Sequence, residues 1–364
     1  MRPVYGSWGG GWGIVYLTNF DPLKIVVHMK MVSYLKDGHD QLALYLDGVL
    51  FDLDRLHPDL PGNMGMMLNY WDELLPMVRA AEISIQEGRI STDKGIAIES
   101  VRLLAPVPSP GSLRDGYAFR QHVAAARRNR GAAMIEEFDQ YPVFYFSNHH
   151  SIQGPGEVLC MPDHFEKLDF ELELAIVICK QGRNIPAEEA DEYIGGLMIM
   201  NDFSARRLQM EEMLLNLGPA KGKDFSTALG PWLVTPEELE AMEVPAKPNH
   251  RGKSWNLEMQ CRVNGQQVSQ GNARDMDWTF AEIIERASYG VDLFPGDIIG
   301  SGTVGTGCFL ELNGSGRLHD PGYADQWLVP GDQVELEVQG LGVLSSLIVK
   351  DEDPFSILAR KKQA

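Results

Sequence analysis

Acidic residues alternate with apolar ones at the start of residues 169–178, which read Asp-Phe-Glu-Leu-Glu-Leu-Ala-Ile-Val-Ile. The two-residue repeat of a strand places Glu171 and Glu173 on one face, where their carboxylates can share a cation. A solvated strand face has the same pattern. However, Ala175 and Val177 continue this face, which favours burial, and buried carboxylates need a compensating cation.

Asp202 ends a second apolar run and precedes residues 204–217, for which we expect a helix. Arg206 and Gln209 follow Asp202 at the spacing of one helical face, so a ligand held near Asp202 can contact both. Two simpler interpretations remain open. Asp202 can be a helix N-cap, or it can form a weak surface ion pair with Arg206.

A lysine and a histidine add candidate acid–base groups. Lys223 lies in a glycine-interrupted loop, a position typical of a solvated lysine. His122 follows Asp115 and Tyr117 and begins a helix expected over residues 121–130. A lone histidine on a helix is more often a packing or surface residue than a base, so the pattern alone leaves its role open.

A Gly-x-Gly-x-x-Gly run over residues 300–305 matches the spacing of the dinucleotide-binding motif, which requires a helix directly after the glycines. Residues 308–312 look like a strand instead, so we expect no nucleotide site there. The same loop can still deliver Thr303 and Glu311 to a site.

Short elements must position these residues. Residues 31–53 predict a small β meander with Asp-Gly turns at 37–38 and 47–48, and residues 68–78 predict a helix weakened by Pro76. Three prolines within residues 106–112 indicate a stiff connector. We therefore expect an N-terminal extension (1–28), a small β domain with one helix (29–105), the connector (106–112) and a larger domain (113–364).

The larger domain is expected to be rich in strands. Pro-Gly-Asp turns at residues 295–297 and 330–332 each precede a β-rich run, and Asn264-Gly265 marks a hairpin. The sequence therefore predicts an α+β fold dominated by sheet.

Composition excludes several classes of protein. The chain has 364 residues and a net charge of −19, which disfavours nucleic acid as a partner, because binding to nucleic acid depends on Lys and Arg. No uncharged apolar run reaches the roughly 18 to 20 residues of a membrane span, so we expect no membrane insertion. Four cysteines without a zinc or disulfide spacing indicate a reducing cytoplasm.

Taken in order, these positions resemble the fumarylacetoacetate hydrolase family over roughly residues 100–350. The matching elements are Asp115-x-Tyr117-x-x-x-Gln121-His122, Glu171-x-Glu173, Asn201-Asp202-x-x-x-Arg206-x-x-Gln209, Gly222-Lys223-x-Phe225, and Gly302-Thr303 followed by Glu311. Each element is weak alone, but five in the family's order are specific. The resemblance implies a mixed β-sandwich roll as the catalytic domain, a small N-terminal β domain and a homodimer.

The resemblance also implies a divalent metal, Mg²⁺ or Ca²⁺ with Mn²⁺ as a further option, and no organic cofactor. The implied metal ligands are Asp115, Glu171, Glu173 and Asp202. A site built only from carboxylate oxygens suits hard cations. Arg206 and Lys223 can offset the remaining negative charge and can also bind an anionic substrate.

Family hydrolases that cleave carbon–carbon bonds in 1,3-diketo acids pair a His with a Glu, and His122 and Glu311 match these positions. Glu311 then orients His122, which deprotonates the water that attacks the carbonyl, while the metal stabilises the departing enolate. The implied oxyanion donors are Arg206, Gln209 and Lys223, and the implied substrate contacts are Tyr117, Tyr145 and Thr303. The resemblance thus favours a cytoplasmic hydrolase of fumarylacetoacetate or an acylpyruvate-like acid in the catabolism of aromatic compounds.

Some positions depart from the family's pattern. Ser226 replaces a glycine, Gly131 replaces an arginine that binds the far carboxylate of fumarylacetoacetate, and Met213 replaces a substrate-contacting tyrosine. These changes concern the acyl part of the substrate more than the reaction. Two alternatives remain. One is a metal-dependent decarboxylase, hydratase or tautomerase of a 2-oxo acid, and the other is a β-rich metal-binding protein without enzymatic activity.

Overall fold

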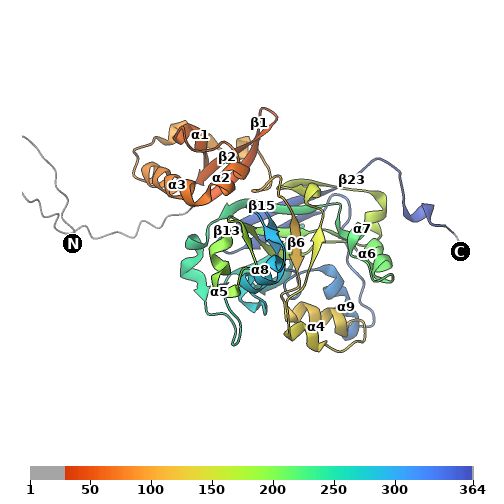
Figure 1. Cartoon of the computed structure of the whole chain (residues 1–364). Helices are drawn as coiled ribbons and strands as arrows, with labels where there is room; N and C mark the ends of the chain where they lie inside the picture. Colours follow the sequence, from red (N-terminus) through yellow and green to blue (C-terminus); the bar gives the residue numbers. More distant parts are fainter. Residues whose placement is uncertain (1–28, 363–364) are drawn as a thin grey trace, which may run out of the picture.

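Residues 29–362 are described by the computed structural model, and the extension expected over residues 1–28 lies outside them. The described chain consists mainly of a 12-stranded mixed sheet and a 5-stranded sheet, with few helices (Figure 1). The predicted sheet-dominated α+β class is confirmed.

The first unit is the predicted β meander of β1 (Lys30–Lys36), β2 (His39–Leu46) and β3 (Val49–Asp52). Both Asp-Gly turns have positive φ at both residues, between 46° and 86°, as a two-residue hairpin turn requires. Three helices follow: α1 (Leu53–Leu56), α2 (Met64–Asn69) and α3 (Trp71–Gln86). The expected single helix is therefore a pair that breaks at Tyr70, and α3 continues through Pro76.

The large sheet joins this meander to the rest of the chain. Its other strands are β4 (Ile96–Ala97), β5 (Arg102–Leu103), β6 (Leu113–Gly116), β7 (Phe144–Ser147), β8 (Ile152–Gln153), β11 (Leu172–Ile178), β13 (Ile194–Asp202), β15 (Thr227–Val234) and β21 (Ile298–Gly300). The main path runs β4-β3-β2-β1-β15-β13-β11-β21-β6-β7, with β1 and β15 paired antiparallel. Residues 105–112 contain no helix or strand. The division into domains at this connector stays a prediction, and the sheet runs across it.

The second sheet covers one face of the first. It consists of β19 (Gln266–Asn272), β18 (Glu258–Val263), β22 (Gln333–Val338), β23 (Gly342–Lys350) and β9 (Gly156–Cys160), in that order. Leu174 of β11 shares a core with Met259 of β18, while Ala175 and Val177 on the opposite face of β11 share a core with Trp71 of α3. Strand β11 is therefore buried on both faces.

Helices lie around the sheets. Those near the acidic residues are α4 (Arg120–Arg128), α6 (Arg206–Met213), α7 (Ala220–Lys223) and α9 (Phe309–His319), and α5 (Ala187–Ala190) packs against α8 (Phe280–Ser288). The remaining short strands are β10 (Leu168–Asp169), β12 (Gly182–Arg183), β14 (Ser204–Ala205), β16 (Glu243–Val244), β17 (Ser254–Trp255) and β20 (Asp292–Leu293). Helices α4 and α6 confirm two expected helices, and α4 lies beside α9 (Figure 1). Within residues 29–362, no helix has the length and apolar character that a membrane span needs.

The strand expected over residues 308–312 is wrong, because these residues begin α9. The carboxylate of Asp169 accepts hydrogen bonds from the N–H groups of Phe309 (2.7 Å) and Leu310 (2.9 Å), which stabilises the start of this helix. A helix thus does follow the glycine run. Its first N–H groups, however, are occupied by the chain's own carboxylate rather than left for a phosphate.

Candidate active site

Three buried carboxylates meet beside the ends of β6 and β11. Asp115, Glu171 and Glu173 each place one carboxylate oxygen within 4.8 Å of the others. Sheet register brings them together, because β11 pairs with β21 at Ala175–Gly300 and β21 pairs with β6 at Gly300–Asp115. The face that carries Glu171 and Glu173 is buried, so the interpretation as a solvated strand face is wrong.

Glycines make room for this cluster. A Cβ on Gly300 would lie 2.5 Å from Oδ1 of Asp115, so a side chain there would displace the carboxylate. Gly302 has a φ of +78°, which favours glycine, and its N–H donates to Oδ1 of Asp115 at 3.0 Å. The glycine run that resembles a nucleotide-binding loop therefore shapes the acidic cluster.

The cluster carries more negative charge than its surroundings neutralise. Burial, assisted by the charge of Asp202, raises the pKa of Asp115 to about 7. Burial and the charges of Asp115 and Glu171 raise the pKa of Glu173 well above its usual value. Oε2 of Glu173 is buried, and among the described residues no nitrogen or alcohol hydroxyl donates to it, so its neighbour is the carboxyl of Asp115. An oxygen-only donor set with an unsatisfied oxygen fits a hard divalent cation.

Asp202 ends β13 beside the cluster and has its own partners. Its Oδ1 accepts a hydrogen bond from Thr227 at 3.1 Å, and its Oδ2 accepts from Nζ of Lys223 at 2.8 Å and from the hydroxyl of Tyr145. The N-cap interpretation is wrong, because α6 begins at Arg206 and Ala205 is its N-cap. The role of Asp202 as a fourth metal ligand stays a prediction.

Lys223 is buried at the end of the short helix α7 and is not the solvated loop lysine of the simpler interpretation. It donates to both Glu171 and Asp202. Burial opposes its charge, but the attraction of these two carboxylates raises the pKa of Lys223. This lysine therefore links Asp202 at the end of β13 to Glu171, which directly precedes β11.

Arg206 is a second buried cation. Its Nε donates to Asp169 at 2.8 Å, its Nη2 donates to Glu171 at 2.8 Å and its Nη1 donates to Gln209 at 3.0 Å. No ion pair with Asp202 forms, so the surface-pair interpretation is wrong. Burial pushes the pKa of Glu171 upward, but the charges of Lys223 and Arg206 outweigh this effect and hold it at about 2.

A histidine–glutamate pair lies next to the cluster. Nδ1 of His122 in α4 is 2.6 Å from Oε2 of Glu311 in α9, and both side chains are buried. Oε1 of Glu311 accepts from the N–H of Thr306 at 3.0 Å, which fixes the carboxylate. His122 lies close enough to Glu171 for a positive charge on its ring to lower the pKa of that carboxyl, so the pair is within electrostatic range of the cluster. With Nδ1 bound to Glu311, Nε2 is the nitrogen left to exchange a proton.

The three predicted substrate contacts lie around these groups. Thr303 donates to Oε1 of Glu173 at 3.2 Å, and Tyr145 donates to Asp202. The ring of Tyr117 meets the His122 ring edge-on, with centroids 5.8 Å apart. Thr303 and Tyr145 therefore orient carboxylates in the structure, and contact of all three residues with substrate stays a prediction.

Comparison with known proteins agrees with this geometry. The sequence family described as fumarylacetoacetate (FAA) hydrolase C-terminal matches residues 112–349. The chain belongs to the fumarylacetoacetate hydrolase family. It is 30% identical over 335 residues to the mitochondrial oxaloacetate tautomerase FAHD2A of Bos taurus, a match that covers 88% of this chain and 92% of that protein.

Two solved structures show the shared fold of the family. The fumarylacetoacetate hydrolase from psychrophilic Exiguobacterium antarcticum superposes with a TM-score of 0.64 at 24% identity, covering 89% of this chain and 100% of that one. The maleylpyruvate hydrolase from Sphingobium sp. SYK-6, in complex with manganese(II) and pyruvate, gives a TM-score of 0.63 at 19% identity with the same coverage. Family members thus carry the names of both hydrolases and a tautomerase.

Sequence reasoning assigned no role to two residues of this family site. Oδ1 of Asn201 accepts from the N–H of Glu171 at 3.0 Å and so orients the backbone at that acid. Asp169 is completely buried and binds Arg206 and the start of α9. Asp169 heads the same alternating face as Glu171 and Glu173, so the strand pattern could have included it.

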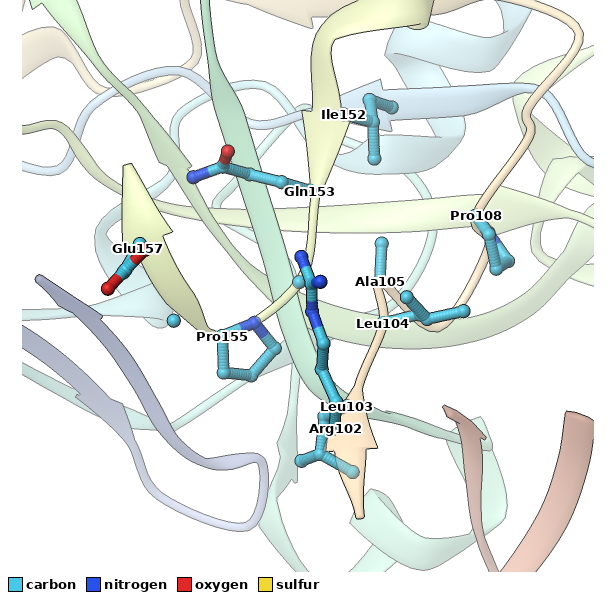
Figure 2. Close-up of a pocket in the computed structure, with 11 residues that line it drawn as sticks. Arg102, Leu103, Leu104, Ala105, Pro108, Ile152, Gln153, Pro155 and Glu157 are labelled. Carbon is cyan, nitrogen blue, oxygen red and sulfur yellow. The ribbon is translucent and has the colours of Figure 1, made fainter. Parts of the chain in front are cut away.

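A cavity of about 470 Å³ lies elsewhere, between the connector and the β8–β9 segment. Figure 2 shows its lining, which consists of residues 102–105, Pro108 and residues 152–157. None of the predicted site residues lines this cavity, so it is separate from the family site.

Proposed function

We propose that this protein is a divalent-metal-dependent hydrolase that cleaves a carbon–carbon bond in a 1,3-diketo acid such as fumarylacetoacetate or an acylpyruvate. The observation that carries this proposal is the buried His122–Glu311 pair, with Nδ1 and Oε2 2.6 Å apart, beside the carboxylates of Asp115, Glu171 and Glu173. A base held by a carboxylate is the arrangement that activates water at neutral pH.

In this mechanism, Nε2 of His122 takes a proton from water, and the hydroxide adds to the substrate carbonyl. Glu311 keeps the ring oriented and stabilises the positive charge that forms on it. When the carbon–carbon bond breaks, one fragment leaves as a carboxylic acid and the other as an enolate, which His122 can protonate on carbon. Lys223 uses two of its three N–H groups on Glu171 and Asp202, so the third is left to donate to a substrate oxygen.

Asp115, Glu171 and Glu173, with Asp202 as the predicted fourth ligand, would hold the divalent cation. Bound there, Mg²⁺, Ca²⁺ or Mn²⁺ supplies Lewis-acid stabilisation of the enolate oxygens. The two buried cations, Arg206 and Lys223, make the surroundings suitable for an anionic oxo acid.

A second candidate function is tautomerisation of a 2-oxo acid such as oxaloacetate. The 30% identity to an oxaloacetate tautomerase over 88% of this chain favours it. The same His122–Glu311 pair can move a proton between carbon and base, but this reaction takes up no water and breaks no carbon–carbon bond.

One experiment separates these functions. Acylpyruvates, fumarylacetoacetate and oxaloacetate are offered to metal-stripped and Mg²⁺-restored protein, with diketone and enol absorbance followed and products identified by mass. The matched control for His122→Ala is His250→Ala, because His250 also pairs with a glutamate, Glu282, at 3.0 Å.

Metal-dependent formation of two acids that requires His122 but not His250 supports the hydrolase. Enol–keto conversion without cleavage supports the tautomerase. Turnover that is unchanged in His122→Ala contradicts both, and turnover of none of these acids by folded, metal-loaded protein favours the non-enzymatic alternative. A homodimer, a cytoplasmic location and a place in aromatic-compound catabolism stay predictions.

A further inference from the structure

The carboxylate of Asp169 connects parts of the chain that are far apart in sequence. Its Oδ1 accepts hydrogen bonds from the N–H groups of Phe170 (3.0 Å) and Phe309 (2.7 Å). Its Oδ2 accepts from the N–H of Leu310 (2.9 Å) and from Nε of Arg206 (2.8 Å). The residue is 0% exposed, so water does not compete for these bonds.

These bonds join the two halves of the site. On one side, Leu310 directly precedes Glu311, the partner of His122. On the other side, the guanidinium of Arg206 that binds Asp169 also donates to Glu171 of the acidic cluster. One carboxylate therefore fixes the helix that carries the glutamate and the cation that holds the cluster.

The start of α9 shows that this contact is more than an ordinary helix cap. Its N-cap residue, Cys308, makes no side-chain capping bond, and the capping carboxylate comes from a residue 140 positions away. In contrast, α8 is capped by its own Thr279 through a local capping box. A local cap stabilises a helix, whereas a distant cap also sets where the helix lies relative to the strand.

We propose that Asp169 is a positioning residue that holds the His122–Glu311 pair in register with the acidic cluster. The proposal rests on the proposed function, because it gives the catalytic pair its placement. Asp169 touches no substrate and acts through Glu311 and Arg206.

The test uses Asp169→Asn, which keeps the shape of the side chain and replaces one acceptor oxygen with an NH₂ group. Whichever way the amide turns, its NH₂ faces two donors, either the Phe170 and Phe309 pair or the Leu310 and Arg206 pair, and can accept from neither. The matched control is Asp191→Asn. Asp191 also accepts a backbone N–H, that of Lys253 at 3.0 Å, and lies outside the site.

The first readout is the downfield NMR resonance of the His122 Nδ1 proton, assigned by its loss in His122→Ala. We expect Asp169→Asn to shift or broaden it and Asp191→Asn to leave it unchanged. An unchanged resonance in folded Asp169→Asn overturns the positioning role. This readout needs no turnover, so it stands even if the proposed function fails.

The second readout is kinetic. We expect Asp169→Asn to lower kcat about 10- to 100-fold with a smaller effect on KM. Added to His122→Ala, the same change should cost little more, because the base that it positions is already gone. If the fold losses in kcat of the two single variants multiply in full in the double variant, the proposal is overturned. Wild-type turnover in His122→Ala contradicts the proposed function instead.

A measurement on the wild-type protein covers the case in which Asp169→Asn does not fold. Hydrogen exchange should show the N–H groups of Phe309 and Leu310 strongly protected, although they are the first two of α9 and have no partner within the helix. Exchange as fast as that of surface amides overturns the proposal.

Discussion

A single buried acid in the N-terminal meander and the acidic cluster of the site differ in how fully their carboxylates are hydrogen-bonded or ion-paired. In the N-terminal meander, Asp52 accepts hydrogen bonds from Tyr34 (2.6 Å) and Lys36 (2.5 Å) and pairs with Arg55 (3.3 Å). In the acidic cluster, Asp115 and Glu173 lie against further acids, and no nitrogen or alcohol hydroxyl among the described residues donates to Oε2 of Glu173.

The difference separates a carboxylate that supports the fold from carboxylates whose oxygens suit a divalent cation. Asp52 finds its donors within 18 residues of sequence, and its network is complete without any other molecule. The acids of the cluster lie on β6, on β11 and directly before β11, and their excess negative charge is costly in a buried place unless a cation binds. Buried carboxylates whose charge the chain's own cations do not balance are therefore the physical sign of a functional site here.

The largest difference between the two regions should appear in turnover. Glu311→Gln removes the charge that orients His122 and stabilises its protonated form, so we expect kcat to fall about 10²- to 10⁴-fold. Steady-state kinetics on the substrate found in the panel measures this, with circular dichroism as the check of folding. Glu282→Gln makes the same change in the His250–Glu282 pair and should keep wild-type turnover. Comparable losses in both variants would contradict a special role for Glu311.

The next largest effect should be on stability, at the lysine between the two site strands. Lys223→Met leaves Glu171 and Asp202 buried without their shared cation, and we expect a loss of about 3 to 5 kcal/mol in the free energy of unfolding. Urea denaturation measures it. Lys221→Met in the same short helix removes only an exposed pair with Asp224 and should cost less than about 1 kcal/mol. Equal losses would mean that Lys223 is not the counter-ion of the cluster.

The meander and the site also differ in how far sequence predicts them. The Asp-Gly turns and strands of the meander follow from local residues, because turn type and alternation fix them. The shared face of Glu171 and Glu173 follows equally from the strand repeat. These features need no knowledge of distant contacts.

Other site features depend on tertiary contacts that no local pattern contains. Residues 308–312 form a helix because Asp169 caps it from 140 positions away, so the strand expectation failed. Arg206 turns to Asp169 rather than to Asp202, and Lys223 is buried because two distant carboxylates surround it. Local rules predicted a strand over residues 308–312, a surface ion pair for Arg206 and a solvated side chain for Lys223, and these distant contacts override all three.

Because of the excess negative charge of the cluster, the stability of the metal-free protein should depend on pH. In the metal-free protein the pKa of Asp115 is about 7 against an ordinary 3.8, so the folded state holds this proton more tightly, and stability should fall as pH rises from about 4 to about 7. Glu171, with a pKa of about 2 against 4.5, acts in the opposite sense and contributes stability that is lost as pH falls below 4.5.

Mg²⁺ binds the ionised carboxylates, so it should abolish the decline in stability between pH 4 and 7. At 100 times its Kd it should add about 2.7 kcal/mol to the free energy of unfolding. Calorimetric Tm values across this pH range, with EDTA and with Mg²⁺, measure both effects. In Glu173→Gln the Tm of the metal-free protein should fall less with rising pH, and Mg²⁺ should raise that Tm less than it does in the wild type. A metal-free Tm that is flat or rises over this interval would contradict the charge excess.

The smallest effect should come from the meander. Asp52→Asn weakens the bonds from Tyr34 and Lys36 but leaves a neutral acceptor in place, and Arg55 is largely exposed, so we expect a loss of about 1 to 2 kcal/mol. Because the network is complete in itself, the Tm increase caused by Mg²⁺ should equal that of the wild type. Thermal denaturation with and without Mg²⁺ tests this. A smaller increase in Tm with Mg²⁺ would mean that Asp52→Asn shifts β1 and β15 and so displaces Thr227 and Asp202. Asp52 and the acidic cluster would then be coupled through the continuous sheet.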